Sequence, residues 1–217
     1  MEVNDVNEAI EYIKKNSPER KFEESVEIAI NLKDVDMTNP KNRINEEILL
    51  PKGRGKDLKI AIFGSNEMNV KARGTADYIF GPEDISKFAD DKKAFKKIVN
   101  DVHFFISEAS LMTNIGKSLG QVLGPRGKMP RPVPPGQDPT GLIKNLKNTV
   151  KARSRNSVTL HIPVGTRTMD TKDLSENVIT VINRVTGKLE RGSSSIKSVY
   201  IKTTMGNSTE IKAGVKK

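Results

Sequence analysis

Apolar and polar residues alternate along several stretches near both ends of the chain. Within residues 25–33, the apolar side chains at every second position are those of Val26, Ile28, Ile30 and Leu32. A period of two is typical of a strand with one buried face. The sequence therefore predicts a strand here, and related patterns predict further strands over 44–50, 157–164 and 196–204.

Helical periodicity separates these predicted strands. Residues 3–15 place apolar side chains at helical spacing, and Leu174, Val178, Ile182 and Val185 do the same later in the chain. Strands with one apolar face need helices or a second sheet to cover that face. Both ends of the chain together therefore predict a small antiparallel sheet covered by helices.

The middle of the chain has a different pattern. Short, nearly continuous apolar runs occupy 58–64, 76–80 and 102–107, and segments of helical character separate them around 67–73 and 84–99. Continuous apolar runs are typical of parallel strands that are buried on both faces. This alternation predicts a Rossmann-like, three-layer α/β domain.

The two patterns predict an α/β protein of two domains, one inserted into the other. The outer α+β domain is discontinuous, over 1–57 and 156–217, and the inserted domain covers 58–155. A Gly-rich charged segment at 51–57 forms the first crossing, and a basic helix over 140–153 leads to the second near 155. Two crossings of this kind permit hinge motion between domains.

Charge changes this picture because its distribution is uneven. The 217 residues carry 37 Lys and Arg against 27 Asp and Glu, a formal charge of +10. Residues 111–155 contain nine basic side chains and one acidic side chain, whereas residues 1–50 are net acidic. Such asymmetry favours a localised phosphate-binding surface. A solvated basic face that serves solubility is the alternative.

Several classes of protein are disfavoured by composition. No apolar run reaches the ~18 residues of a membrane span, and the acidic start has no signal-peptide pattern. We therefore expect a soluble cytoplasmic protein. Cysteine is absent, which excludes disulfides and thiol chemistry.

Catalytic and cofactor motifs are incomplete. Gly116-Lys117-Ser118 resembles the end of a phosphate-binding P-loop, but Leu111 stands where that motif needs glycine. A helix whose Gly116 and Gly120 lie at a packing contact is the favoured interpretation. His103 and His161 lack metal-ligand spacing. We expect no enzyme, no metal and no cofactor. A nucleotide-binding enzyme and a DNA-binding architectural protein remain competing hypotheses.

The most basic region contains a segment that is rich in proline and glycine. Residues 123–141 hold six prolines and four glycines, which favour fixed turns over helix or sheet. This segment and the helix predicted to follow it carry a candidate basic surface for a phosphate backbone, made of Arg126, Lys128, Arg131, Lys144, Lys147 and Lys151.

The outer domain carries a second candidate surface. Glu27 lies on the polar face of its predicted strand, and Thr204 and Gly206 lie where the strand over 196–204 ends. A carboxylate repels phosphate, so Glu27 would contact nucleic acid only by accepting a hydrogen bond, as from a ribose 2′-OH. Simple solvent exposure is the alternative for Glu27. Aromatic residues are only 5% of the chain, which favours structured RNA over stacked single strands.

Three separated motifs resemble the ribosomal protein L-one family, in its archaeal form. They are KFEESVEIAINLKDVD (21–36), LGPRGKMPRP (123–132) and SVYIKTTMGNS (198–208). The resemblance implies a two-domain component of the mobile stalk of the large ribosomal subunit. It also implies RNA contacts by Lys21, Phe22, Ser25, Glu27, Thr204, Met205 and Gly206. Ser25 and Asn207 stand where many relatives have Thr and Pro.

The same resemblance implies a set of partners. They are large-subunit ribosomal RNA, deacylated transfer RNA leaving the exit site, and the protein's own messenger RNA, whose translation it would repress. The resemblance implies a free protein that is monomeric and needs no cofactor. The basic surface then becomes secondary, in contact with RNA backbone or transfer RNA.

Overall fold

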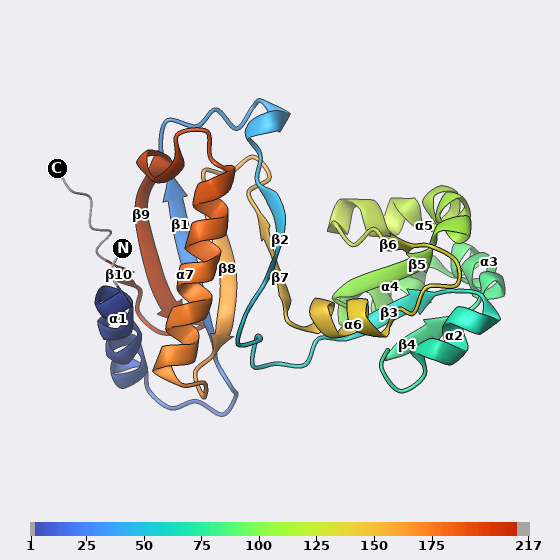
Figure 1. The fold of residues 1–217 in the computed structure, drawn as a ribbon, viewed down its shortest axis with the longest axis horizontal. Coiled ribbons are helices and arrows are strands. Elements are labelled where there is room, and N and C mark those ends of the chain that lie inside the picture. The colour runs from blue at the N-terminus through green and yellow to red at the C-terminus, as the bar shows by residue number, and fades with distance from the viewer. Residues whose placement is uncertain (1–2, 212–217) are drawn as a thin grey trace. The chain divides into compact units, whose positions relative to one another are not determined.

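The computed structural model describes residues 3–211 and divides them into two compact units (Figure 1). The first unit contains the chain up to Lys56 and again from Asn148 onward, and the second contains Asp57–Lys147. Helices and sheets both contribute, so the predicted α/β class is confirmed. The basic C-terminal tail beyond residue 211 lies outside the described residues.

A four-stranded antiparallel sheet forms the centre of the first unit. Its order is β10-β9-β1-β8, with β1 (Ser25–Leu32), β8 (Thr159–Thr166), β9 (Ile196–Thr203) and β10 (Thr209–Ile211). Side chains of β1 are alternately buried and half-buried, as its sequence predicts. The central strands come from opposite ends of the chain, with Val26 opposite Thr203 and Glu27 opposite Lys202.

Two helices cover one face of this sheet. Helix α1 (Val3–Asn16) buries Val6, Ile10 and Ile13, and α7 (Thr171–Lys188) buries an apolar stripe beginning at Leu174. Their apolar faces and the inward side chains of β1, β8 and β9 form one core. The side chains on the opposite sheet face are half-buried or exposed, and they include Glu27, Asn31 and His161.

A two-stranded ribbon, β2 (Asn45–Leu49) with β7 (Thr149–Arg153), belongs to the first unit. The predicted helix over 140–153 is therefore wrong in its second half. Helix α6 (Thr140–Lys147) ends early, and the residues after it pair antiparallel with β2. The second crossing consequently lies at 147–148 and not near 155.

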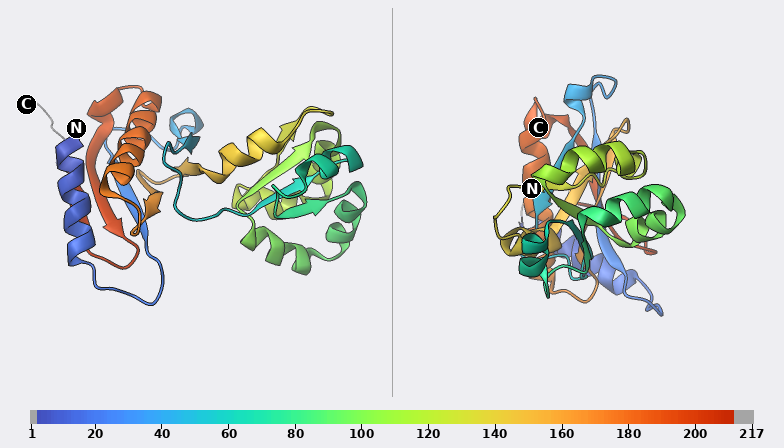
Figure 2. Two further views of the ribbon diagram at one scale, coloured as in Figure 1. Left: turned by 60° about the horizontal axis from the view of Figure 1, so that its bottom comes forward. Right: turned by 90° about the vertical axis from the view of Figure 1, so that its right-hand side faces the viewer.

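A four-stranded parallel sheet of order β4-β3-β5-β6 forms the second unit (Figure 2). Every residue of β3 and β5 is buried, as expected of strands covered on both faces. Helices α3, α4 and α5 pack on one face, and α2 and α6 pack on the other. The bounds are β3 (Ile60–Phe63), α2 (Asn66–Ala72), β4 (Tyr78–Phe80), α3 (Pro82–Asp90), α4 (Lys92–Asp101), β5 (Phe104–Glu108), α5 (Met112–Arg126) and β6 (Arg131–Val133). Short 3₁₀ turns occupy Pro40–Asn42, Ala109–Leu111 and Gly192–Ser195.

The Pro- and Gly-rich segment 123–141 is more regular than predicted. Helix α5 continues through Pro125 to Arg126 and ends at Gly127, which takes a left-handed conformation with φ of 65°. Residues 131–133 then form the edge strand β6. Atoms added at the Cβ positions of Gly116 and Gly120 would meet no neighbour within 4 Å, so the expected packing contact at these glycines is wrong.

Candidate nucleic-acid interface

The residues that the sequence singled out in two distant motifs meet at one end of the two central strands of the antiparallel sheet. Strand β1 starts where its neighbour β9 ends, so Ser25 and Glu27 lie beside the turn that carries Thr204, Met205 and Gly206. Lys21 and Phe22 are exposed in the loop that leads into β1. These seven residues are called the strand-end cluster.

Hydrogen bonds fix the centre of the strand-end cluster. The Thr204 N–H donates to the Ser25 carbonyl at 2.9 Å, and the Ser25 N–H donates to Thr204 Oγ1 at 3.0 Å. The Thr204 hydroxyl also donates to the Ser25 carbonyl at 3.2 Å. A hydroxyl has one donor and two lone pairs, so this Oγ1 keeps one lone pair for a donor from a ligand.

The turn after β9 is held from below by buried polar groups. Ser17 Oγ and Thr203 Oγ1 hydrogen-bond each other at 2.7 Å beneath Gly206. A Cβ at Gly206 would lie 2.1 Å from the first oxygen and 2.3 Å from the second. A side chain at Gly206 would therefore force Ser17 and Thr203 to shift, so the close approach at this glycine lies inside the protein.

A buried carboxylate, which the sequence analysis did not single out, also positions this turn. Glu24 is only 2% exposed, and its Oε1 accepts a hydrogen bond from the Met205 N–H at 3.0 Å. Arg20 and Arg167 each lie 3.7 Å from its oxygens. Glu24 lies two residues before the inward-facing Val26, so the alternation of the strand places it on the buried side as well. A carboxylate at such a core position is the sequence signal that could have identified Glu24.

Arg167 joins this junction to the end of α1. Its guanidinium donates to the carbonyls of Lys14, Ser17 and Pro18 at 3.1, 2.8 and 3.1 Å. These carbonyls belong to the last turn of α1 and the residues after it, which have few partners within the helix. The loop before β1, the α1 terminus and the turn after β9 are thus connected through Glu24 and Arg167.

An open groove borders the strand-end cluster. It is lined by residues 19–24, Arg167 and Thr168, with a volume of about 680 Å³. Phe22, 52% exposed, and Met205, 60% exposed, offer apolar surface next to basic side chains. Hydrogen bonds from threonine hydroxyls, chiefly that of Thr168, lower the pKa of the Glu23 carboxyl at its rim.

The first crossing also lies against the cluster. The Lys56 ammonium donates to the Glu23 carbonyl at 2.7 Å and to Ser25 Oγ at 3.2 Å. Arg54 is half-buried near Glu27. Burial lowers the pKa of the Arg54 guanidinium, and the Glu27 carboxylate opposes this shift. The sequence presented this segment only as a linker.

The six residues of the secondary basic surface come from several different elements. Lys128 donates to the carbonyls of Val99 and Val102, both at 2.6 Å, and so caps the end of α4. Lys151 lies on β7 in the first unit and pairs with Glu47 at 3.5 Å. In the second unit, Arg126 ends α5 and donates to a carbonyl of that helix, whereas Lys144 and Lys147 lie on α6, across the sheet.

Arg131, the remaining member of that surface, lies on the edge strand β6. Its side chain is half-buried, and burial lowers the pKa of its guanidinium. The six basic residues are therefore spread over several elements, and Lys128 has a clear structural role. Their expected arrangement on one loop and one helix face is wrong.

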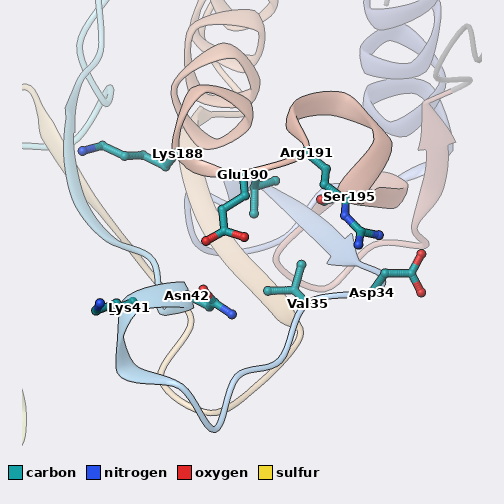
Figure 3. Close-up of a pocket in the computed structure, with 9 residues that line it drawn as sticks. Asp34, Val35, Lys41, Asn42, Lys188, Glu190, Arg191 and Ser195 are labelled. Carbon is teal, nitrogen blue, oxygen red and sulfur yellow. The ribbon is translucent and has the colours of Figure 1, made fainter.

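A smaller hollow of about 100 Å³ occupies the other end of the first unit, beyond the end of β1 (Figure 3). Its lining mixes acidic and basic side chains, including Asp34, Glu190 and Arg191. Lys188 turns to Glu46 on β2, at 2.9 Å. The hollow contains none of the predicted contact residues, so the strand-end cluster remains the candidate interface.

The described residues offer little for other chemistry. His161 is exposed on β8, opposite Ala29. Within residues 3–211, no group of three or more His, Asp or Glu side chains is placed to hold a metal ion. None of the described helices has the length and apolar composition to cross a bilayer.

Comparison with known proteins gives a consistent result. A model of the ribosomal protein L1p/L10e family matches residues 12–207. Similar proteins include the large ribosomal subunit proteins uL1 of Thermoplasma acidophilum, 75% identical over the whole of both chains, and of Thermoplasma volcanium, 74% identical over 99% of each. The protein of the same name from Picrophilus torridus is 58% identical over 96% of this chain and 98% of its own.

Proposed function

The chain belongs to the ribosomal protein L1p/L10e family, in its archaeal form, and we propose that it binds large-subunit ribosomal RNA through the strand-end cluster. Membership makes it a structural, non-enzymatic constituent of the ribosome. Its high identity to proteins named as large-subunit components supports the large subunit as its place. The residue-level mechanism that follows is our proposal.

In this proposal, the two units act as separate domains. The unit built from both chain ends is the outer RNA-binding domain, and the inserted unit with the parallel sheet is a Rossmann-like domain. The outer domain anchors the protein to RNA as part of the mobile stalk. The inserted domain contributes basic side chains such as Lys144 and Lys147 for salt-dependent attraction to RNA backbone or transfer RNA.

The observation that carries the proposal is the meeting of two motifs far apart in sequence. The hydrogen bonds between Ser25 and Thr204 hold their backbones in one arrangement before any ligand binds. Groups fixed in advance lose little conformational entropy on binding. A preformed cluster at the ends of two central strands is suited to RNA that is recognised by shape and by ribose contacts.

Each group in the cluster has a role that follows from its chemistry. Glu27 accepts a hydrogen bond from a ribose 2′-OH, which DNA lacks. The free lone pair of Thr204 Oγ1 accepts a second donor from the RNA. The exposed side chains of Phe22 and Met205 cover apolar surface of the bases, and Lys21 attracts phosphate.

The proposal includes the wider roles that the family resemblance implies. The protein helps deacylated transfer RNA leave the exit site. It also represses translation of its own messenger RNA, which presents a similar structure to the same cluster. It acts in the cytoplasm on the ribosome, and it is monomeric when free.

A filter-binding titration tests the central claim. Wild-type protein is titrated with large-subunit ribosomal RNA and with duplex DNA of equal length, at two salt concentrations. We expect RNA-selective binding that Thr204→Ala weakens by about 5- to 150-fold, the cost of one or two lost buried hydrogen bonds at about 1–3 kcal/mol. Thr204→Ser keeps the hydroxyl and should retain most of the affinity.

Thr180→Ala provides a matched control. Thr180 is half-buried on α7, and among the described residues its hydroxyl donates to the Glu176 carbonyl of its own helix. Its replacement should leave RNA affinity unchanged. Equal affinity for RNA and DNA, insensitive to Thr204→Ala and abolished by salt, would reduce the interface to a nonspecific basic surface and overturn the proposal.

A further inference from the structure

The segment Pro51–Lys56, which leads toward the second unit, runs beside the strand-end cluster. Lys56 reaches the Glu23 carbonyl and Ser25 Oγ. Arg54, two residues earlier, lies close enough to Glu27 for the two charges to interact. The segment therefore brings two cations to strand-end positions that RNA is proposed to contact.

Contacts with the first unit hold this segment in place. The amide of Asn177, a fully buried residue of α7, donates to the Gly53 carbonyl at 2.8 Å and accepts from the Lys52 N–H at 3.1 Å. Gly55 has a φ of 73°, and a Cβ there would lie 2.6 Å from Thr166 Oγ1. Only glycine fits this approach, so Arg54 extends from a backbone anchored on both sides.

The three cations of the segment have different surroundings. Lys52 lies 3.3 Å from Asp173 and 3.6 Å from Glu176, both on α7. Lys56 has the oxygen partners given above. Within the described part of the chain, the Arg54 guanidinium makes no hydrogen bond and no ion pair, although it is half-buried.

A half-buried guanidinium without hydrogen-bond partners indicates a ligand. Partial burial removes some of the water around its N–H donors while leaving the group accessible, and no described residue offers those donors an acceptor. Guanidinium groups bind phosphate oxygens with paired, charge-assisted hydrogen bonds. The Glu27 carboxylate by itself would repel the phosphate that follows any ribose it contacts, and a cation beside it offsets this repulsion.

We propose that Arg54 is a further RNA-contacting residue, whose guanidinium binds a backbone phosphate next to the ribose that Glu27 contacts. This inference rests on the proposed function, because it places one more contact in the same interface. It extends the interface from the strand-end cluster to the first crossing. RNA bound there contacts the segment that continues into the second unit.

A salt titration of RNA affinity separates this role from a structural one. Each phosphate contact contributes about 0.7–0.9 to the slope of log K against log salt concentration. We expect Arg54→Ala to weaken binding of a large-subunit ribosomal RNA fragment about tenfold at low salt and to reduce the slope by about that amount. Arg54→Lys keeps the charge and should restore the slope, with part of the affinity.

Lys52→Ala is the matched control, because Lys52 lies on the same segment and its ammonium pairs with α7. It should change neither the slope nor the affinity. If Arg54→Ala weakens binding with the wild-type slope, or leaves binding unchanged, the proposed phosphate contact is wrong. If wild-type protein shows no preference for RNA, the proposed function itself fails, which is a distinct result.

Chemical modification of wild-type protein gives a test that needs no variant to fold. Phenylglyoxal modifies accessible guanidinium groups, and peptide mass spectrometry locates the modified arginines. RNA should protect Arg54 and leave Arg184, which is exposed on the helical side of the first unit, equally reactive with and without RNA. Equal reactivity of Arg54 with and without saturating RNA would overturn the inference.

Discussion

Replacing Gly206 with alanine tests whether the turn proposed to contact RNA depends on its buried support. The new Cβ would lie 2.1 Å from Ser17 Oγ and 2.3 Å from Thr203 Oγ1, well inside contact distance. Overpacking of a buried site costs about 1–3 kcal/mol, and the hydrogen bond between the two hydroxyls contributes about 1 kcal/mol more. We therefore expect the free energy of unfolding of the first unit to fall by about 2–4 kcal/mol.

Urea denaturation followed by tyrosine fluorescence measures this loss, since Tyr12 and Tyr200 belong to the first unit and Tyr78 to the second. Gly187→Ala is the matched control. A Cβ at Gly187 meets nothing within 4 Å, so alanine in this helix should stabilise the protein by up to about 1 kcal/mol. Ser17→Ala combined with Gly206→Ala removes the nearer oxygen and should recover part of the stability. Wild-type stability for Gly206→Ala alone would refute the reasoning.

Three further predictions concern buried and paired charges. Glu24→Ala removes the acceptor of the Met205 N–H and should lower the free energy of unfolding by about 2–4 kcal/mol, whereas Glu24→Gln, measured alongside it, should lose less than half as much. Hydrogen bonds, chiefly from Lys59, lower the pKa of the Asp101 carboxyl in the folded protein. The ionised carboxylate therefore stabilises the fold at pH values above the pKa of this group in the unfolded chain, and this contribution is lost as the pH falls through its pKa in the folded protein. Asp101→Asn should therefore flatten the acid limb of a stability-against-pH titration, and an unchanged limb would contradict this. Lys128→Met removes the cap of α4 and should destabilise the second unit by about 1–3 kcal/mol, while the salt slope of RNA binding stays at the wild-type value.

Local periodicity was sufficient for much of the fold. Alternation over 25–33 predicted β1, and helical spacing predicted α1 and α7, because each pattern follows from burying one face of an element. The same reasoning wrongly predicted a helix over 149–153, because Val150 continues the helical spacing of Ile143 and Leu146. These residues form a strand because β2 pairs with them, and a partner about 100 residues away leaves no local signal.

The proposed interface was predictable only in part, for a related reason. The polar parity of Glu27 is visible in the sequence, and so is the small, polar turn that follows β9. The importance of Glu24 and Arg54 depends on which segments meet, and this is decided by the pairing of β1 with β9 and by the contacts of Asn177. In the sequence, Arg54 and Glu24 look like ordinary solvent-exposed charged residues, because their neighbours in the fold are not visible there.

The buried junction explains why the turn that carries Thr204 and Met205 can be both exposed and well positioned. Such a turn would ordinarily be among the more mobile parts of a domain. Here Glu24 accepts the Met205 N–H, and the hydroxyl pair of Ser17 and Thr203 lies beneath Gly206. Buried polar groups of this kind impose a specific geometry, since any shift leaves a donor or acceptor unpaired. The side chains proposed to contact RNA are thus exposed, while the groups that position them are buried.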